Sequence, residues 1–287
     1  MTMDYQYKPL EFGDADLELY TRFLAEHYGQ PELFTFEYIK WQYRDNPAGK
    51  AVGYNAFYGG KLVAHVVTIP FKAVIGDSVE VGLLLANAMT VPQHRRKGIS
   101  VGLADNIENM GLDLGCTFVV GIANRNSTPA YIKGRKMELV GPLGARMGLG
   151  LPSRLREMEN YDFQLAWDNE TLDWRLNRPG STYWQNMVAG RRVIYAGSGK
   201  PGIKTIMGHF KPDLLQKDLP AKGPSPMPVS LWIGMDSDIR WGRSLYVPIP
   251  KKLRPSPLNF LFKDLSGKNR KLAEKKIFFQ TVDFDVF

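Results

Sequence analysis

The chain has 287 residues, 44% of them hydrophobic, which is enough to bury one large core or two modest ones. It contains no run of eighteen apolar residues and no signal-peptide pattern, so membrane insertion is not expected and the protein is predicted to be cytoplasmic. The net charge of +8 is not interleaved with aromatic residues as in a single-strand nucleic-acid groove, so small polyanions are expected ligands and nucleic acid is not.

Two helices and a β-hairpin are predicted at the start of the chain. The helices cover residues 14–27 and 35–43, and in the first of them apolar residues recur at steps of three and four, which gives it one buried face. The hairpin strands cover residues 53–58 and 61–68, and Gly59-Gly60 between them is a two-residue turn signal.

A buried strand, a basic loop and a patterned helix then follow each other. Pro92 ends the strand predicted over residues 79–91, because proline cannot donate to a sheet ladder. The helix starts at Ile99, and the amides of its first turn, together with the helix dipole, attract an anion. Gly98 permits close approach of the backbone, and residues 95–97 add three positive charges. The pattern indicates a phosphate-binding loop, and a basic turn that only faces solvent is the alternative.

A second strand and helix complete this part of the chain. The strand is predicted over residues 116–123, and the helix begins after Asn124 and includes Tyr131. A further strand is expected over residues 138–143.

These two strand-to-helix segments resemble the signatures of the GNAT superfamily of N-acetyltransferases. Residues 95–100, Arg-Arg-Lys-Gly-Ile-Ser, resemble its Arg/Gln-x-x-Gly-x-Gly/Ala loop, with Ser100 at the last position. Residues 124–133 resemble the start of its Asn-x-x-Ala-x-x-x-Tyr-x-Lys helix. The resemblance covers roughly residues 1–150, and it implies an α/β fold in which helices flank a mixed, mostly antiparallel sheet.

The resemblance also implies acetyl-coenzyme A as acyl donor and the transfer of its acetyl group to a primary amine. The loop would hold the pyrophosphate, and the strand before it would offer backbone groups to the pantetheine arm. The cofactor-binding residues implied in this way are Met89, Val91, Arg95, Arg96, Lys97, Gly98, Ile99, Ser100, Asn124 and Ser127.

The catalytic groups are less well specified by the resemblance. Tyr131 is implied as the acid that protonates the departing thiolate, and a ring that only packs under the cofactor is the alternative. The strand position that carries a carboxylate base in some relatives is Leu84. Glu80, on the same face of that strand, and His65, on the neighbouring strand, are the candidate bases. The alternative for His65 is a histidine that is only packed in the core. A chain of water molecules would remove the need for either base.

The second half, residues 151–287, contains a weak internal repeat. Residues 41–47, which begin with Trp41 and end with a proline, recur loosely from Trp174, at an offset near 130 residues. We therefore expect an acetyl-CoA-binding domain over residues 1–150 and a degenerate GNAT-like half over 151–287 that contacts the acceptor. Coincidence between two helix ends is the alternative.

The acceptor and two competing functions stay open at this point. Residues 41–47, 254–260 and 283–287 resemble long bacterial acetyltransferases of surface-polysaccharide synthesis, which implies an amino sugar, or a nucleotide-linked one, as acceptor. Tandem GNAT aminoacyl (Fem-like) transferases that use charged tRNA share the two-half architecture but do not need the loop. A binding module that holds acetyl-CoA without turnover is the third class, because Leu84 is not a carboxylate. The oligomeric state is not predicted, and a homodimer is compatible with the sequence.

Cysteine and histidine usage gives no indication of a metal site. The single cysteine, Cys116, lies in an apolar strand and is expected to be a small core residue, which excludes a disulfide framework and a thiolate cluster. The four histidines lack the spacing of metal ligands. They are His27, His65, His94 and His209.

Overall fold

The computed structural model describes residues 4–152, 161–215, 218–223, 226–254 and 256–284. Its helices are α1 (Asp14–Tyr28), α2 (Phe36–Tyr43), α3 (Ile99–Asp113), α4 (Thr128–Arg135) and α5 (Asn169–Leu176). Its strands are β1 (Gln6–Pro9), β2 (Val52–Tyr58), β3 (Lys61–Ile75), β4 (Ser78–Thr90), β5 (Phe118–Ala123), β6 (Glu138–Pro142), β7 (Gly144–Leu149), β8 (Phe163–Leu165), β9 (Tyr183–Val188), β10 (Arg191–Gly197), β11 (Ile203–Phe210), β12 (Val229–Asp236), β13 (Tyr246–Pro248), β14 (Asn259–Asp264) and β15 (Ile277–Gln280). No helix in these ranges is long and apolar enough to cross a membrane.

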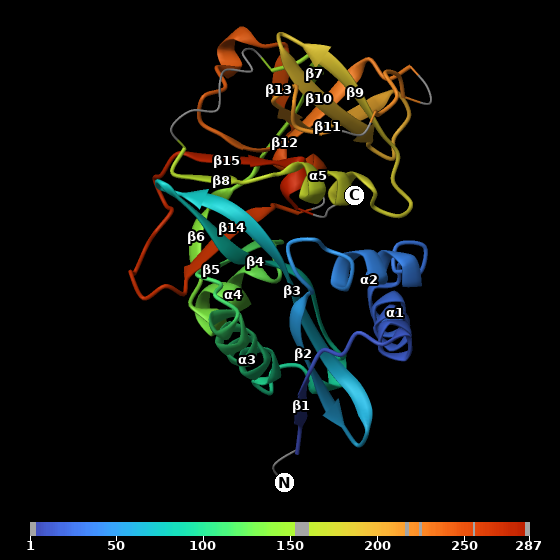
Figure 1. The fold of residues 1–287 in the computed structure, drawn as a ribbon, viewed down its shortest axis with the longest axis vertical. Helices are drawn as coiled ribbons and strands as arrows, with labels where there is room; N and C mark the ends of the chain where they lie inside the picture. The colour runs from blue at the N-terminus through green and yellow to red at the C-terminus, as the bar shows by residue number, and fades with distance from the viewer. Residues whose placement is uncertain (1–3, 153–160, 216–217, 224–225, 255, 285–287) are drawn as a thin grey trace.

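One continuous mixed sheet runs through the described residues (Figure 1). Its main path is β6-β14-β5-β4-β3-β8-β15-β12-β11-β10-β9, and β2 extends it from β3, with β1 on the outside. Most neighbouring strands are antiparallel, and the pairs β4/β5, β11/β12 and β8/β15 are parallel. The α/β fold with a mostly antiparallel sheet, expected from the sequence, is confirmed.

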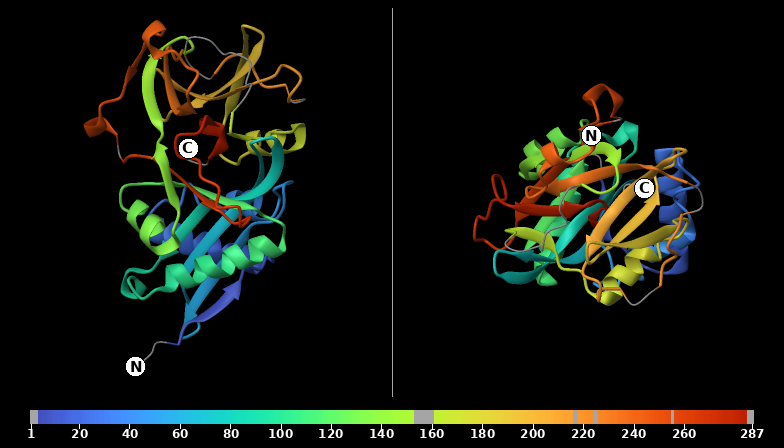
Figure 2. Two further views of the ribbon diagram at one scale, coloured as in Figure 1. Left: turned by 90° about the vertical axis from the view of Figure 1, so that its left-hand side faces the viewer. Right: turned by 90° about the horizontal axis from the view of Figure 1, so that it is seen from above.

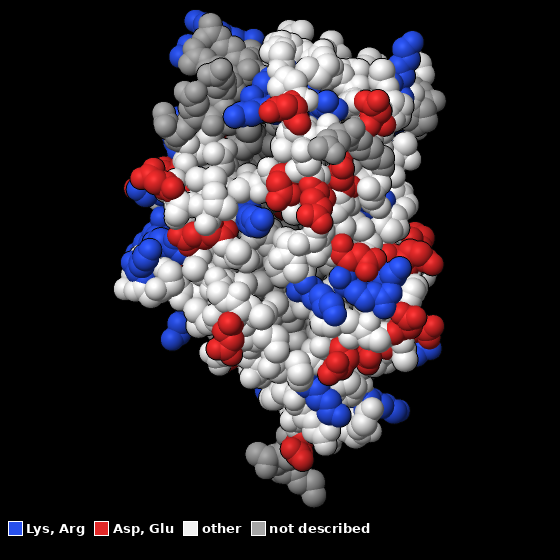
Figure 3. Space-filling view, viewed as in Figure 1, with Lys and Arg blue, Asp and Glu red and all other residues white. Residues whose placement is uncertain are grey.

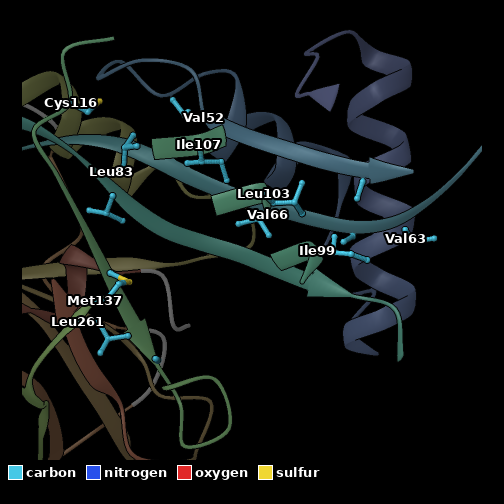
Figure 4. Packing of buried hydrophobic residues seen from close by; sticks show 14 residues of the cluster. Val52, Val63, Val66, Leu83, Ile99, Leu103, Ile107, Cys116, Met137 and Leu261 are labelled. Atoms are coloured by element: carbon cyan, nitrogen blue, oxygen red, sulfur yellow. The ribbon is translucent and has the colours of Figure 1, made fainter. Parts of the chain in front are cut away.

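Helices cover both faces of the first half of the sheet (Figure 1). The pair α1 and α2 packs on one face, where its buried side chains meet Val67 and Ile69 of β3. The helix α3 packs on the other face, where Leu103 and Ile107 meet Val66. Figure 4 shows these α3 side chains directed toward the strands. The sheet is therefore held between two apolar layers, as the patterned helices predicted.

Strand β3 continues seven residues beyond its predicted end at Thr68. Pro70 lies within this extension, although proline lacks the N–H that a central strand position needs. The carbonyl of Pro70 accepts a hydrogen bond from Asn46 Nδ2 at 2.9 Å, so its backbone groups face away from β4. The proline is tolerated because no hydrogen bond to β4 is lost there.

The two halves of the chain exchange strands. β14, from the second half, lies between β5 and β6 and is antiparallel to both. In return β7, from the first half, pairs with β12 along its whole length, from Gly144 opposite Gly234 to Leu149 opposite Val229. Figure 2 shows β7 reaching from the lower into the upper part of the molecule. Each half therefore contains a strand that the other half supplies. Backbone hydrogen bonds join the halves in addition to the chain connections.

The second half repeats the strand order of the first. β2 and β3 form a hairpin around Gly59 and Gly60, and β9 and β10 form one around Ala189 and Gly190; all four turn residues have positive φ, from 49° to 75°. In both halves the next strand is antiparallel to the hairpin, and the one after it is parallel. The connection from β11 to β12 contains no helix in its described residues, so α3 has no counterpart there.

The two tryptophans of the sequence repeat contact each other. Trp41 of α2 and Trp174 of α5 stack with ring centroids 4.7 Å apart and planes at 18°. Each indole Nε1 donates to the backbone carbonyl of the other residue, at 2.9 and 3.0 Å. This reciprocal contact is what a pseudo-twofold relation between two similar halves produces, and the stacking contributes about 1 kcal/mol beyond its buried area.

Candidate functional site

The basic loop forms a cradle of backbone amides at the start of α3. Gly98 is the N-cap residue with φ of 76°, and its carbonyl accepts the first helical bonds, from the amides of Val101 and Gly102. The amides of Ile99 and Ser100 precede these bonds and point out of the helix end. No heavy atom lies within 4 Å of a Cβ built on Gly98, so the space in front of the loop is open.

Positive charge and an unusual backbone accompany this cradle. Arg95, Arg96 and Lys97 are exposed, and Arg96 adopts a left-handed conformation with φ of 60°. A non-glycine residue in that region costs about 1–3 kcal/mol, and such strain is characteristic of ligand loops. The Arg95 Nε donates to the carbonyl of Thr90 at 2.9 Å, which ties the loop to the end of β4. The geometry suits an anion of the size of a diphosphate.

Strands β4 and β5 separate next to the loop. Their parallel pairing ends at Leu85 opposite Gly121, whereas β4 continues to Thr90. The pairing of β4 with β3 shifts register at the same place, since Leu85 pairs with Thr68 and Ala88 with Val66. Two β4 residues therefore oppose one β3 residue, and the bulge bends β4 away from β5.

Two tyrosines lie near this opening. The Tyr28 hydroxyl donates to the carbonyl of Ala88 at 3.1 Å and lies 3.4 Å from its amide. Burial raises the pKa of Tyr28, the hydrogen bond with the Ala88 backbone lowers it, and the phenol of Tyr131 raises it. Tyr131 and Ala88 pack against the same apolar cluster, which includes Ile99 and Leu103 of α3. Sequence reasoning had not singled out Tyr28, because a tyrosine at a helix end carries no motif.

The structure changes which β4 backbone groups face the opening. The Val91 amide donates to Val63 of β3 at 2.9 Å, and Met89 pairs with His65 two residues earlier, so both face β3. The groups of Ala88 face the opposite side. Met89 and Val91 were expected to offer backbone groups to the pantetheine arm, and this stays a prediction; the backbone groups of Ala88, which face away from β3, contact the Tyr28 hydroxyl.

The residues expected at the start of the second helix form its cap. The Asn124 Oδ1 accepts from the amides of Asn126 and Ser127, at 2.9 and 3.0 Å. The Ser127 hydroxyl donates back to Asn124. These bonds order the turn that precedes α4, the helix that carries Tyr131.

A buried arginine connects that helix to the cradle. Arg135 is 6% exposed, and its guanidinium lies 4.8 Å from the centre of the Tyr131 ring. It also donates to the hydroxyl and the carbonyl of Ser100, at 3.1 and 3.3 Å. Burial lowers the pKa of Arg135. The loop and Tyr131, far apart in sequence, are thus fixed to each other.

Glu80 lies away from this opening, near the start of β4. Its carboxylate accepts from Arg270 at 2.8 and 2.9 Å and from the Thr117 hydroxyl. Burial by itself would raise the pKa of Glu80, but these hydrogen bonds hold it below the ordinary value. Arg270 also pairs with Asp264 at 2.8 Å. We leave Glu80 out of the proposed catalytic groups, because a carboxylate fixed in this network is a poor proton acceptor.

His65 is completely buried between the rings of Tyr20 and Tyr43. Its Nδ1 lies 2.7 Å from Asn55 Oδ1, and its Nε2 lies 3.0 Å from the Tyr43 hydroxyl. Burial lowers the pKa of His65 to about 3. The ring is neutral at pH 7 and both nitrogens are engaged, so we do not assign it the role of general base.

The buried histidine predicts a loss of stability in mild acid. Below pH 6.5 the unfolded chain binds a proton at this residue, and the folded chain does not until about pH 3, so stability falls as pH falls through that window. Between pH 7 and 5.5 we expect His65→Gln to lose about 1 kcal/mol less of its unfolding free energy than the parent. Urea unfolding at both pH values measures this, and equal losses would contradict it.

Comparison with solved structures gives this geometry its context. The chain superposes on a probable N-acyltransferase of Enterococcus faecalis with a TM-score of 0.62, at 12% identity over 92% of this chain and 73% of the other. It superposes on a GCN5-related N-acetyltransferase of Anabaena variabilis with a TM-score of 0.59, at 12% identity over 91% and 73%. The chain has the GNAT fold. No family model and no curated protein matches the sequence.

The GNAT fold extends to the second half. A tandem GNAT protein from the clavulanic acid biosynthesis pathway matches 93% of this chain and 100% of its own, with a TM-score of 0.50 at 10% identity. This agrees with the repeated strand order and with the reciprocal contact of Trp41 and Trp174. This supports the expected GNAT-like second half, and the domain boundary at residue 150 stays a prediction.

The charged loop of this GNAT fold gives a salt-dependent prediction. Arg96→Asn removes a charge and keeps a residue that tolerates positive φ. We expect the Kd for acetyl-CoA to rise about fivefold at low salt and the difference to shrink toward 1 M salt, because exposed charges are screened. Calorimetric titration at two salt concentrations measures this, with Lys271→Asn, at an exposed lysine outside the loop, as control. An effect independent of salt would instead indicate that Arg96 acts through loop conformation.

Proposed function

We propose that the protein is an N-acetyltransferase that moves the acetyl group of acetyl-CoA to a primary amine. The single observation that carries this proposal is the amide cradle at Gly98 beside the opening between β4 and β5, where Tyr28 contacts the backbone of Ala88 and Tyr131 packs against the same apolar cluster as Ala88. The cradle fits a diphosphate, and the opening would receive the arm that follows it.

The proposed residues act on a reaction that needs little covalent help from the protein. The amine nitrogen forms a bond to the thioester carbon, the carbon–sulfur bond breaks, and the sulfur leaves as thiolate. Tyr131 gives its proton to that sulfur, and the amine proton passes to water, from which Tyr131 is reprotonated. Holding the two reactants together can supply about 7 kcal/mol or more of the barrier reduction.

Two alternatives differ in their ligands. The tandem architecture fits an aminoacyl transferase that uses charged tRNA, but that class does not need the cradle. A binding module without turnover fits the apolar Leu84 at the expected position of the base. The cradle favours a coenzyme A ligand, and the position of Tyr131 beside the opening favours turnover.

The test of the proposed function has two stages. Calorimetric titration with acetyl-CoA should show binding, and a thiol-release assay over a panel of amines, amino sugars included, should show turnover. If acetyl-CoA binds but no amine gives thiol release, the binding module without turnover is the better explanation. If acetyl-CoA does not bind, the proposal is overturned. The amino sugar acceptor stays a prediction that the same panel tests.

A further inference from the structure

A cavity lies between the two halves, beside the opening. Its volume is about 160 Å³, below the roughly 300 Å³ at which ligand sites usually begin, so it would hold only a small group. β4 contributes Leu84 to Asn87, β5 contributes Ile122, and the second half contributes α5 and the residues after β15. Most of its wall is apolar and includes the aromatic rings of Tyr38, Trp41, Phe71, Trp167, Trp174 and Phe284. The closing residues 285–287 lie outside the described part of the chain.

The polar side chains in the wall are bonded to the protein, with one exception. Both amide atoms of Asn46 are used, by Pro70 and Ala48, and both carboxylate oxygens of Asp283 accept, from Trp167 and Gln280. Asn87 is 7% exposed, and its Nδ2 donates twice. No hydrogen bond to its Oδ1 is seen among the described residues, and Asn87 lines the cavity.

The orientation of Asn87 follows from the buried network behind it. Because Asn55 Oδ1 can only accept, the 2.7 Å contact places a proton on Nδ1 of His65, and its Nε2 is an acceptor. The Tyr43 hydroxyl therefore donates to Nε2, and its oxygen accepts from Asn87 Nδ2 at 2.9 Å. The Gln42 Oε1 accepts the second proton of Nδ2, also at 2.9 Å. This leaves the carbonyl oxygen of Asn87 directed away from the network.

Asn87 also adjoins the place where transfer would occur. The next residue, Ala88, contacts the hydroxyl of Tyr28, and Ala88 packs against the same apolar cluster as Tyr131. The bulge at residues 86 and 87 opposes Val67 with two residues and turns Asn87 toward α2. An N–H bonded to Asn87 Oδ1 would belong to a nitrogen close to the point where strands β4 and β5 separate.

We propose that this cavity binds the acceptor, that the acceptor is a small primary amine with an apolar body, and that Asn87 Oδ1 accepts an N–H from its nitrogen. This inference rests on the proposed N-acetyltransferase function. A neutral amide oxygen binds an amine N–H and leaves the lone pair of the nitrogen free to attack. His65 and Tyr43 are positioning residues, because they act only through Asn87.

The wall favours this class over a sugar. The hydroxyls of a sugar would lose water against aromatic rings with few free partners. Acidic side chains are visible over α5 on the face seen in Figure 3, and α5 contributes to the cavity wall, which also carries the cations Lys72 and Arg175. The charge of the wall is therefore mixed, and its apolar rings carry the preference.

The test compares 2-phenylethylamine and glucosamine on the full chain. Calorimetric titration into protein saturated with coenzyme A measures acceptor binding without turnover. We expect 2-phenylethylamine to bind and glucosamine to bind at least about tenfold more weakly. The reverse order would overturn the acceptor class. Because binding is read without turnover, a failure of acetyl transfer would contradict the proposed function and not this inference.

The role of Asn87 is tested by Asn87→Leu, with Asn106→Leu on α3 as the matched control. We expect the first variant to weaken amine binding, and to raise KM for the amine, about tenfold, with the Kd for acetyl-CoA unchanged. Unchanged amine binding in a variant that still binds acetyl-CoA would overturn the assignment. If Asn87→Leu does not fold, Tyr43→Phe takes its place: it removes the hydroxyl that orients Asn87 and should raise KM more than it lowers kcat, whereas a normal KM would overturn the assignment.

Discussion

Gly98→Glu is expected to abolish acetyl-CoA binding while the fold stays intact. The left-handed φ of 76° and the open space in front of the residue place a new side chain where the phosphates would lie. The glutamate would also set a negative charge against them, at the end of a helix dipole that favours anions. We expect the Kd to rise at least about a hundredfold, because several charge-assisted hydrogen bonds are lost together. Calorimetric titration measures this, with circular dichroism as the check of folding.

Gly98→Ala distinguishes the cost of backbone strain from the effect of a side chain that fills the phosphate position. A methyl group there meets no neighbour, so the main cost is the left-handed backbone, about 1–2 kcal/mol of stability. Its Kd should lie between those of the parent and Gly98→Glu. Near-normal affinity in Gly98→Glu would mean that the phosphates bind elsewhere, and the proposed function would lose its main support.

Tyr131→Phe should reduce turnover much more than cofactor binding. The substitution keeps the ring, with its contact to the Arg135 guanidinium at 4.8 Å, and removes only the hydroxyl. Loss of the acid that protonates the thiolate should lower kcat about tenfold to a thousandfold. The coenzyme A thiolate can leave slowly unaided, so some activity should persist. Steady-state kinetics of thiol release and calorimetric Kd values measure the two effects separately.

Two further variants, Tyr28→Phe and Tyr131→Ala, provide controls for this prediction. Tyr28→Phe removes the other phenol at the opening, whose hydroxyl contacts Ala88 at 3.1 Å, and should leave the acid step in place. Tyr131→Ala removes the ring as well and should also weaken cofactor binding. A parent-like kcat in Tyr131→Phe, combined with weak binding in Tyr131→Ala, would make Tyr131 a packing residue.

Much of the first half could be predicted from the sequence because its signals are local. The loop and the start of α3 depend on Gly98, Pro92 and the apolar period of one helix, all within a few turns of chain. The hairpin depends on Gly59-Gly60, which supply positive φ at no steric cost. Even the weak repeat of Trp41 and Trp174 had a physical basis, since the two rings stack.

The tertiary structure alone decided which distant groups meet. Glu80 finds Arg270, 190 residues later, and β14 completes the first sheet from the second half, because strand partners depend on register and packing and not on local pattern. One extra residue in β4 turns Asn87 toward the buried histidine network. A bulge leaves no clear mark in composition or period, so the cavity and the residues that line it emerged only when the two halves were packed together.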